Sequence, residues 1–103
     1  MTQRPSGPSR PGAAVERICL LEHESGLHVR AAAAFVRRAS RFRAAVTVEA
    51  GGTRADGRSV VELLALAAAP GVTLRIVAEG PDAGRAAVEL AELVARGFAE
   101  EES

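Results

Sequence analysis

The sequence predicts an α+β domain in which helices cover one face of an antiparallel sheet. Short stretches that alternate between apolar and polar residues indicate strands, and stretches with apolar residues at helical spacing lie between them. With 103 residues, of which 48% are hydrophobic, the chain can bury one modest core and therefore forms one domain. The expected order is strand, helix, two strands, short helix, strand and helix.

The composition excludes several classes of function. Thirteen basic and thirteen acidic residues cancel, and the chain has three phenylalanines but no tyrosine or tryptophan. A basic surface and an aromatic platform for bases are both missing, so we expect no nucleic-acid partner. No stretch is long enough to span a membrane, and the N-terminus lacks the pattern of a secretory signal, which favours a cytoplasmic location.

The metal-binding residue types are also too few to form a site. Cys19 is the single cysteine, and it has no second cysteine with which to form a disulfide or share a metal. His23 and His28 are the two histidines, and without a cysteine cluster they do not make a zinc site. We therefore expect neither a metal nor another cofactor.

The chain opens with a segment that we expect to be a disordered tail. Residues 1–14 are rich in proline, glycine, serine and arginine, and their prolines interrupt any periodicity. The domain is then expected over residues 15–103, beginning with a strand over residues 15–22. That strand is apolar on both faces, so alternation alone does not show which side chains point inward.

A turn and a helix are predicted directly after the first strand. Gly26 indicates the turn, and the alanine run at residues 31–34 indicates a helix that extends to about Arg41. Arg37 and Arg38 are expected on its solvent face.

His28 falls at or next to the N-cap of this helix. The start of a helix has unpaired N–H groups and a partial positive charge, which together favour an anion, above all phosphate. Arg30 adds a permanent cation, and a neutral imidazole is a nucleophile near pH 7. The stretch can therefore form a phosphohistidine, although a histidine at this position can also serve only as a helix cap.

Two strands and a short helix are expected next. Residues 43–50 alternate in polarity and end at the glycine pair 51–52, which indicates a hairpin to a returning strand at residues 53–56. Ser59 and Glu62 have the spacing of a capping box, in which the serine hydroxyl and the carboxylate satisfy free N–H groups. A second helix therefore starts at Ser59.

The last two elements are a strand and a helix. Residues 72–79 show the clearest alternation in the chain, which is typical of a half-buried strand. Asp82 is the expected cap of the last helix, and Gly97 is placed to end it.

The stretch around His28 resembles the active-site motif of a known family. Residues 26–32 are Gly-Leu-His-Val-Arg-Ala-Ala. HPr, the histidine phosphocarrier protein of the bacterial phosphotransferase system, carries Gly-(Leu/Ile)-His-x-Arg-Pro-Ala between its first strand and first helix. The resemblance covers about residues 15–98. Ala31 replaces the usual proline, which preserves the helix but holds its entry less rigidly.

This resemblance implies a fold and an activity. The HPr fold is an open-faced β-sandwich with a four-stranded antiparallel sheet and three helices on one face, in the order βαββαβα. The implied function is that of a phosphocarrier: enzyme I, charged by phosphoenolpyruvate, phosphorylates His28 at Nδ1, and His28 passes the group to an enzyme IIA domain. Such a chain is a phosphoryl-transfer intermediate and not a free-standing enzyme. The implied catalytic residues are His28 and Arg30, and the implied phosphate-binding residues are Val29 and Arg30.

The resemblance also implies where partners dock. Arg37 and Ser40 on the outer face of the first helix are expected to meet acidic partner surfaces. Val60, Val61 and Leu64 on the second helix are expected to form an exposed apolar docking surface, for which burial in the core is the competing interpretation.

Ser59 has two interpretations. The structural one is the helix cap alone. By resemblance, the serine also lies where some bacteria phosphorylate HPr with a dedicated kinase, and a phosphate there would repel acidic docking surfaces on enzyme I.

Three other functions stay open. A regulatory HPr-like protein, as in the nitrogen-related branch, signals through its phosphorylation state and transports no sugar. A pure interaction domain would have kept the fold and lost transfer, with Ala31 and Glu62 as traces of that change, although retention of His28 and Arg30 argues against it. A free-standing hydrolase fits least, because the local sequence fixes no carboxylate beside His28.

Overall fold

The computed structural model describes residues 14–99, and within them the predicted element order is confirmed. The elements are β1 (Val15–Leu20), α1 (Val29–Ala39), β2 (Ala45–Ala50), β3 (Thr53–Asp56), α2 (Val60–Ala65), β4 (Thr73–Glu79) and α3 (Ala83–Ala95). The tail predicted over residues 1–14 lies, except for Ala14, outside the described residues, as do the last four residues of the predicted domain. Within residues 14–99, no helix is long and apolar enough to cross a membrane.

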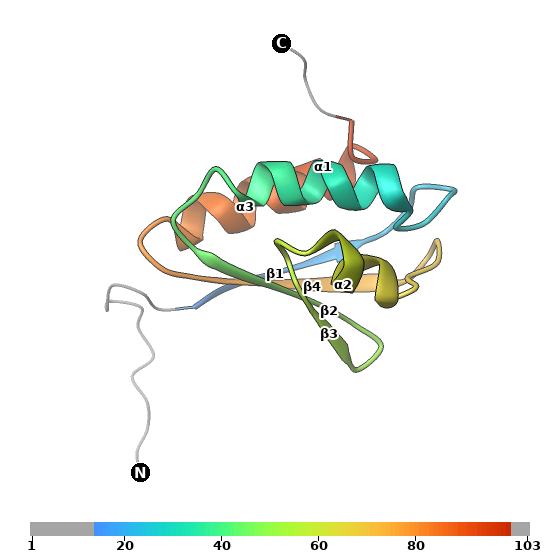
Figure 1. Ribbon diagram of the computed structural model, residues 1–103, viewed down its shortest axis with the longest axis horizontal. Coiled ribbons are helices and arrows are strands. Elements are labelled where there is room, and N and C mark those ends of the chain that lie inside the picture. Colours follow the sequence, from blue (N-terminus) through green and yellow to red (C-terminus); the bar gives the residue numbers. More distant parts are fainter. Residues whose placement is uncertain (1–13, 100–103) are drawn as a thin grey trace.

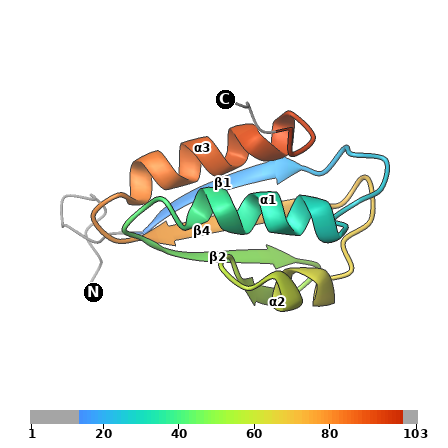
Figure 2. The same ribbon diagram turned by 45° about the horizontal axis from the view of Figure 1, so that its top comes forward.

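The four strands form one antiparallel sheet in the order β1-β4-β2-β3. Helices α1 and α3 lie side by side over one face of this sheet, and α2 lies beside α1, next to β3 (Figures 1 and 2). The other face is open. This is the predicted open-faced α+β sandwich with three helices.

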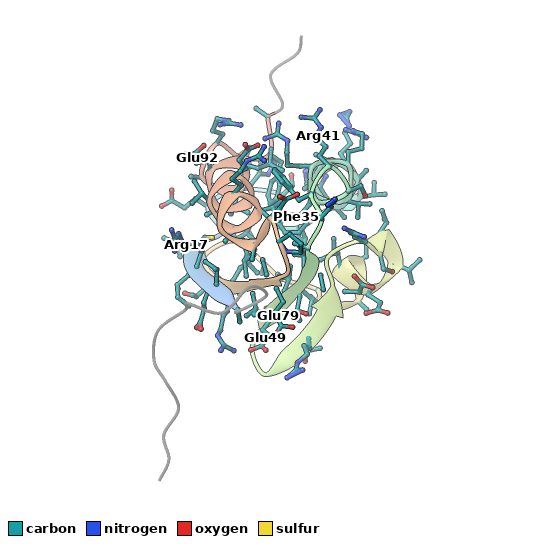
Figure 3. The ribbon with its side chains drawn as sticks, turned by 90° about the vertical axis from the view of Figure 1, so that its left-hand side faces the viewer. Arg17, Phe35, Arg41, Glu49, Glu79 and Glu92 are labelled. Carbon is teal, nitrogen blue, oxygen red and sulfur yellow. The ribbon has the colours of Figure 1, made fainter. Side chains whose placement is uncertain are left out.

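Alternation along the strands places the core between the sheet and the helices. Val46 and Val48 of β2 and Leu74 and Ile76 of β4 are buried on the helix side. Phe35 of α1 points from the helix layer toward the sheet (Figure 3). Glu49 and Glu79 lie on the side of the sheet away from the helices. The core is therefore a single layer that holds α1 directly above the central strands.

Small side chains bring α1 close to the rest of the core. The residues of α1 that are buried are Ala31, Ala32, Ala34, Phe35, Arg38 and Ala39. The prediction that Arg38 faces solvent was wrong, because α3 packs beside α1 and covers that position. Arg38 is 9% exposed, and its Nη1 donates to Glu89 Oε1 of α3 at 3.4 Å. Its apolar stem packs while its charged end reaches the carboxylate.

The open face of the sheet is held by ion pairs. Arg75 at the centre donates to Glu16 Oε2 at 2.8 Å and to Glu49 Oε1 at 2.7 Å, and so joins β1, β4 and β2. The hydrogen bond from Arg75 lowers the pKa of the exposed Glu16 carboxyl. On the same face Ile18 and Leu20 of β1 are exposed.

Several element ends differ from the predicted ones. Helix α1 begins two residues before Ala31, at Val29, and ends at Ala39 instead of Arg41. The hairpin glycines have φ values of +56° and +85°, as a tight turn between strands requires, so the hairpin is confirmed. Asp82 is the N-cap residue of α3, yet its carboxylate accepts from Arg43 N–H at 2.8 Å and makes no cap hydrogen bond. It ties the start of α3 to the segment before β2.

Gly97 ends α3 as predicted. It has a φ of +69°, and the N–H of Phe98 reaches back to the carbonyl of Leu93 at 2.8 Å. This is the Schellman pattern of a helix C-terminus. It turns Phe98 back into the fold, where its side chain is buried.

Candidate functional site

His28 is the N-cap residue of α1, as predicted. Its backbone is extended, with φ −89° and ψ 179°, and its carbonyl accepts the first intrahelical hydrogen bond, from Ala32 at 2.8 Å. Its Nδ1 accepts from the N–H groups of Arg30 at 3.2 Å and Ala31 at 3.4 Å. Two donors that a helix start leaves unpaired are thus aimed at one imidazole nitrogen. In the neutral ring, that nitrogen therefore carries the lone pair, which lies beside the positive end of the helix.

A tight turn holds His28 in this position. Gly26 has a φ of +66°, and its N–H donates to the His23 carbonyl at 2.9 Å. The N–H of the buried Leu27 donates to the carbonyl of Ala68 at 3.1 Å, in the segment between α2 and β4. The turn is so close to that segment that a Cβ on Gly26 would lie 2.6 Å from the oxygen of Ala68. Only glycine satisfies both the backbone angle and the approach.

A pocket of about 290 Å³ opens beside His28. Its lining includes His23, His28, Arg30, Arg37, Gly97 and Phe98. Two guanidinium groups and the helix start make its surroundings suitable for an anion with several oxygens, such as a phosphoryl group. The side chains come from the β1–α1 loop, from α1 and from the end of α3.

Sequence reasoning missed three of these lining residues. The sequence suggests His23 only as a metal ligand and Gly97 only as the end of the last helix, and it gives no sign that Phe98 belongs to the site. The turn at Gly26 folds the chain back at His23, which is a local signal that this residue returns toward His28. Gly97 and Phe98 arrive through packing of distant elements, for which the sequence carries no local signal.

Ala31 has a specific position relative to His28. Because α1 starts at Val29, Ala31 is the third helical residue, and its N–H has no intrahelical acceptor. A proline would therefore break no helical bond here. Alanine instead keeps an N–H, which points at His28 Nδ1. The departure from the family motif adds a donor to the site.

Ser59 is the N-cap residue of α2, as predicted. Its Oγ accepts from the N–H of Glu62 at 3.1 Å. The returning half of the capping box differs from the prediction, because Glu62 Oε1 accepts from Asp56 N–H at 2.8 Å. The Glu62 carboxylate thereby links the end of β3 to α2. Ser59 is half-buried and caps α2 through its hydroxyl alone.

The predicted docking residues lie on two helices. Arg37 and Ser40 are exposed on α1, and Arg37 also lines the pocket with His28. On α2, Val61 is 77% exposed and Leu64 is 36% exposed, whereas Val60 is partly buried against the core. Helix α2 lies beside the N-terminal half of α1 (Figure 2), so these apolar side chains lie at the same end of the molecule as His28.

Comparison with known proteins identifies the family. The family model described as "PTS HPr component phosphorylation site" matches residues 15–96. The chain belongs to the HPr family. "Phosphocarrier protein HPr" of Borreliella burgdorferi is 39% identical to it over 80 residues, which are 78% of this chain and 93% of that protein. HPr proteins are phosphocarriers of the phosphotransferase system, and the predicted family membership is confirmed.

Solved structures and a second kind of relative agree with this result. The structure of HPr-C-His from Thermoanaerobacter tengcongensis matches with a TM-score of 0.79 and 31% identity, covering 85% of this chain and 99% of that one. The "HPr-like protein Crh" of Bacillus subtilis is 35% identical over 71 residues, which are 69% of this chain and 84% of that protein. The HPr family thus includes both phosphocarriers and HPr-like proteins that resemble this chain.

The turn at Gly26 allows a stability test with an internal control. Replacing Gly26 with alanine adds left-handed strain and forces Cβ against the Ala68 carbonyl. Gly51→Ala adds the same kind of strain, at φ +56°, but its Cβ would meet no atom within 4 Å. We expect Gly26→Ala to lower the free energy of unfolding by about 3 kcal/mol and Gly51→Ala by about 1 kcal/mol. Urea denaturation measures both, and equal losses would contradict the packing described for the turn.

Proposed function

We propose that this HPr-family chain accepts a phosphoryl group from phosphorylated enzyme I on His28 and passes it to an enzyme IIA domain. The observation that carries the proposal is the pair of N–H groups, from Arg30 and Ala31, that point at His28 Nδ1. An unprotonated nitrogen surrounded by donors is suited both to attack phosphorus and to hold the product.

The transfer requires no proton movement at the attacking atom. Nδ1 already accepts hydrogen bonds, so in the neutral ring the proton resides on Nε2. The Nδ1 lone pair forms the new N–P bond as the donor's N–P bond breaks, and that electron pair returns to the donor's nitrogen. The N–H groups of Arg30 and Ala31 then pass from Nδ1 to the phosphoryl oxygens. Positioning and charge neutralisation supply most of the effect in such a reaction.

Arg30 and the backbone around Val29 are the proposed phosphate-binding groups. Arg30 is exposed and lines the pocket beside His28, so its guanidinium can approach phosphoryl oxygens from the solvent side. Val29 is 60% exposed at the first position of α1, where its backbone continues the helix start. Partners are proposed to dock along the outer face of α1, through Arg37 and the C-cap residue Ser40, and on the apolar residues of α2.

A regulatory role through Ser59 is the second candidate. It is supported by the position of the Ser59 hydroxyl at the start of α2, where a serine kinase can modify it. A phosphate there adds negative charge beside Val61 and Leu64 on the proposed docking helix. Acidic surfaces of enzyme I would then be repelled while the fold is kept.

The carrier function predicts one acid-labile phosphate on His28. After incubation with enzyme I and phosphoenolpyruvate at alkaline pH, intact mass spectrometry is expected to show a single phosphate that is absent in His28→Ala. Arg30→Gln is expected to slow transfer about tenfold, because a charge-assisted contact is lost. Arg54→Gln, which removes a cation from the exposed hairpin strand, is the matched control and is expected to transfer at the wild-type rate. A phosphate retained in His28→Ala would contradict the proposal.

The regulatory role is tested by a pair of variants that differ only in charge. Asparagine and aspartate are both good N-cap residues, so Ser59→Asn and Ser59→Asp both keep the start of α2. We expect Ser59→Asp to receive phosphate from enzyme I several-fold more slowly than Ser59→Asn at low salt, with the difference shrinking at high salt. Equal rates in a stopped-flow or quenched-flow assay would show that charge at this position has no regulatory effect.

A further inference from the structure

A second histidine lies beside the proposed acceptor. The ring centroids of His23 and His28 are 5.0 Å apart with an interplanar angle of 50°, and both rings line the same pocket. The backbone carbonyl of His23 and its Nδ1 atom both take part in the turn. These bonds do not use the Nε2 atom of the ring.

The hydrogen bonds of His23 determine which of its nitrogens carries the proton. Its Nδ1 accepts from the N–H of Ser25 at 3.1 Å, so in the neutral ring the proton is on Nε2. The neutral ring of His23 therefore presents Nε2–H as its donor.

The end of α3 packs against the other edge of the ring. The edge opposite Nδ1 consists of Nε2 and Cδ2. Cδ2 lies against Gly97, where an added Cβ would be only 3.3 Å away, and Gly97 itself lines the pocket. The Phe98 ring packs edge-on against the imidazole, with centroids 6.2 Å apart and an interplanar angle of 62°. Gly97 and Phe98, which have left-handed backbone angles at the end of α3, therefore hold the His23 ring in position although they are distant from it in sequence.

We propose that His23 is a phosphoryl-binding residue, whose Nε2–H donates to an oxygen of the phosphoryl group carried on His28. The proposal rests on His28 being the phosphoryl acceptor. The phosphoryl group is then held on one side by the N–H groups of the α1 start and on the other by the imidazole of His23. Since a phosphoryl group leaves through a loose transition state, a donor fixed on its oxygens stabilises the charged carrier state and slows loss of the phosphate to water.

The test uses the full chain phosphorylated chemically with phosphoramidate, a small donor that modifies accessible imidazoles. This route does not depend on enzyme I, so a chain that fails as a carrier still reports on His23. Three variants separate the features of the side chain. His23→Phe keeps a ring without a donor, His23→Gln keeps a donor near the position of Nε2 without the ring, and His23→Ala removes both. Glu24→Ala is the control for a change in the same loop.

The readout is the half-life of phospho-His28 at alkaline pH, followed by 31P NMR, with thermal unfolding to verify that each variant is folded. We expect the half-life to fall about threefold or more in His23→Phe and His23→Ala, and to stay near the wild-type value in His23→Gln and Glu24→Ala. A wild-type half-life in His23→Phe, or equal losses in all three His23 variants, would overturn the proposal.

Discussion

The unpaired N–H groups at the start of α1 are the constraint on which the rest of the site depends. A helix start must satisfy its first donors, and here two of them point at the nitrogen of His28. The solution that stabilises the helix in the resting protein is also the one that a phosphoryl group needs, because its oxygens accept the same bonds. Stability and the proposed phosphoryl transfer therefore use one set of donors, and the turn at Gly26 must hold them in place.

That turn links the site to distant parts of the fold. The N–H of Leu27 donates to the carbonyl of Ala68, in the segment after α2, and Gly26 leaves room for this approach. On the opposite side, the end of α3 brings Gly97 and Phe98 against His23. The site is thus built at one end of the helix layer, where three separate segments meet. The open face of the sheet, held by Arg75, contributes nothing to it directly.

Local features of the chain were predictable because they depend on neighbours in sequence. The position of His28 at the helix start, the glycine hairpin and the cap at Ser59 all follow from residues within one or two turns of each other. The exposure of Arg38 was predicted incorrectly, since its burial depends on α3, which is distant in sequence. The same reason explains why Phe98 was not expected in the pocket. Asp82 also differs from the predicted side-chain cap, because its carboxylate accepts a hydrogen bond from the N–H of Arg43.

The central claim is that the N–H groups of Arg30 and Ala31 pass from His28 Nδ1 to the phosphoryl oxygens. The most direct test is a pair of 1H–15N correlation spectra, recorded before and after phosphorylation of His28. We expect the largest amide shifts at Arg30 and Ala31, together with imidazole 15N shifts that place phosphorus on Nδ1. Unchanged amides at these two residues, or phosphorus on Nε2, would contradict the account.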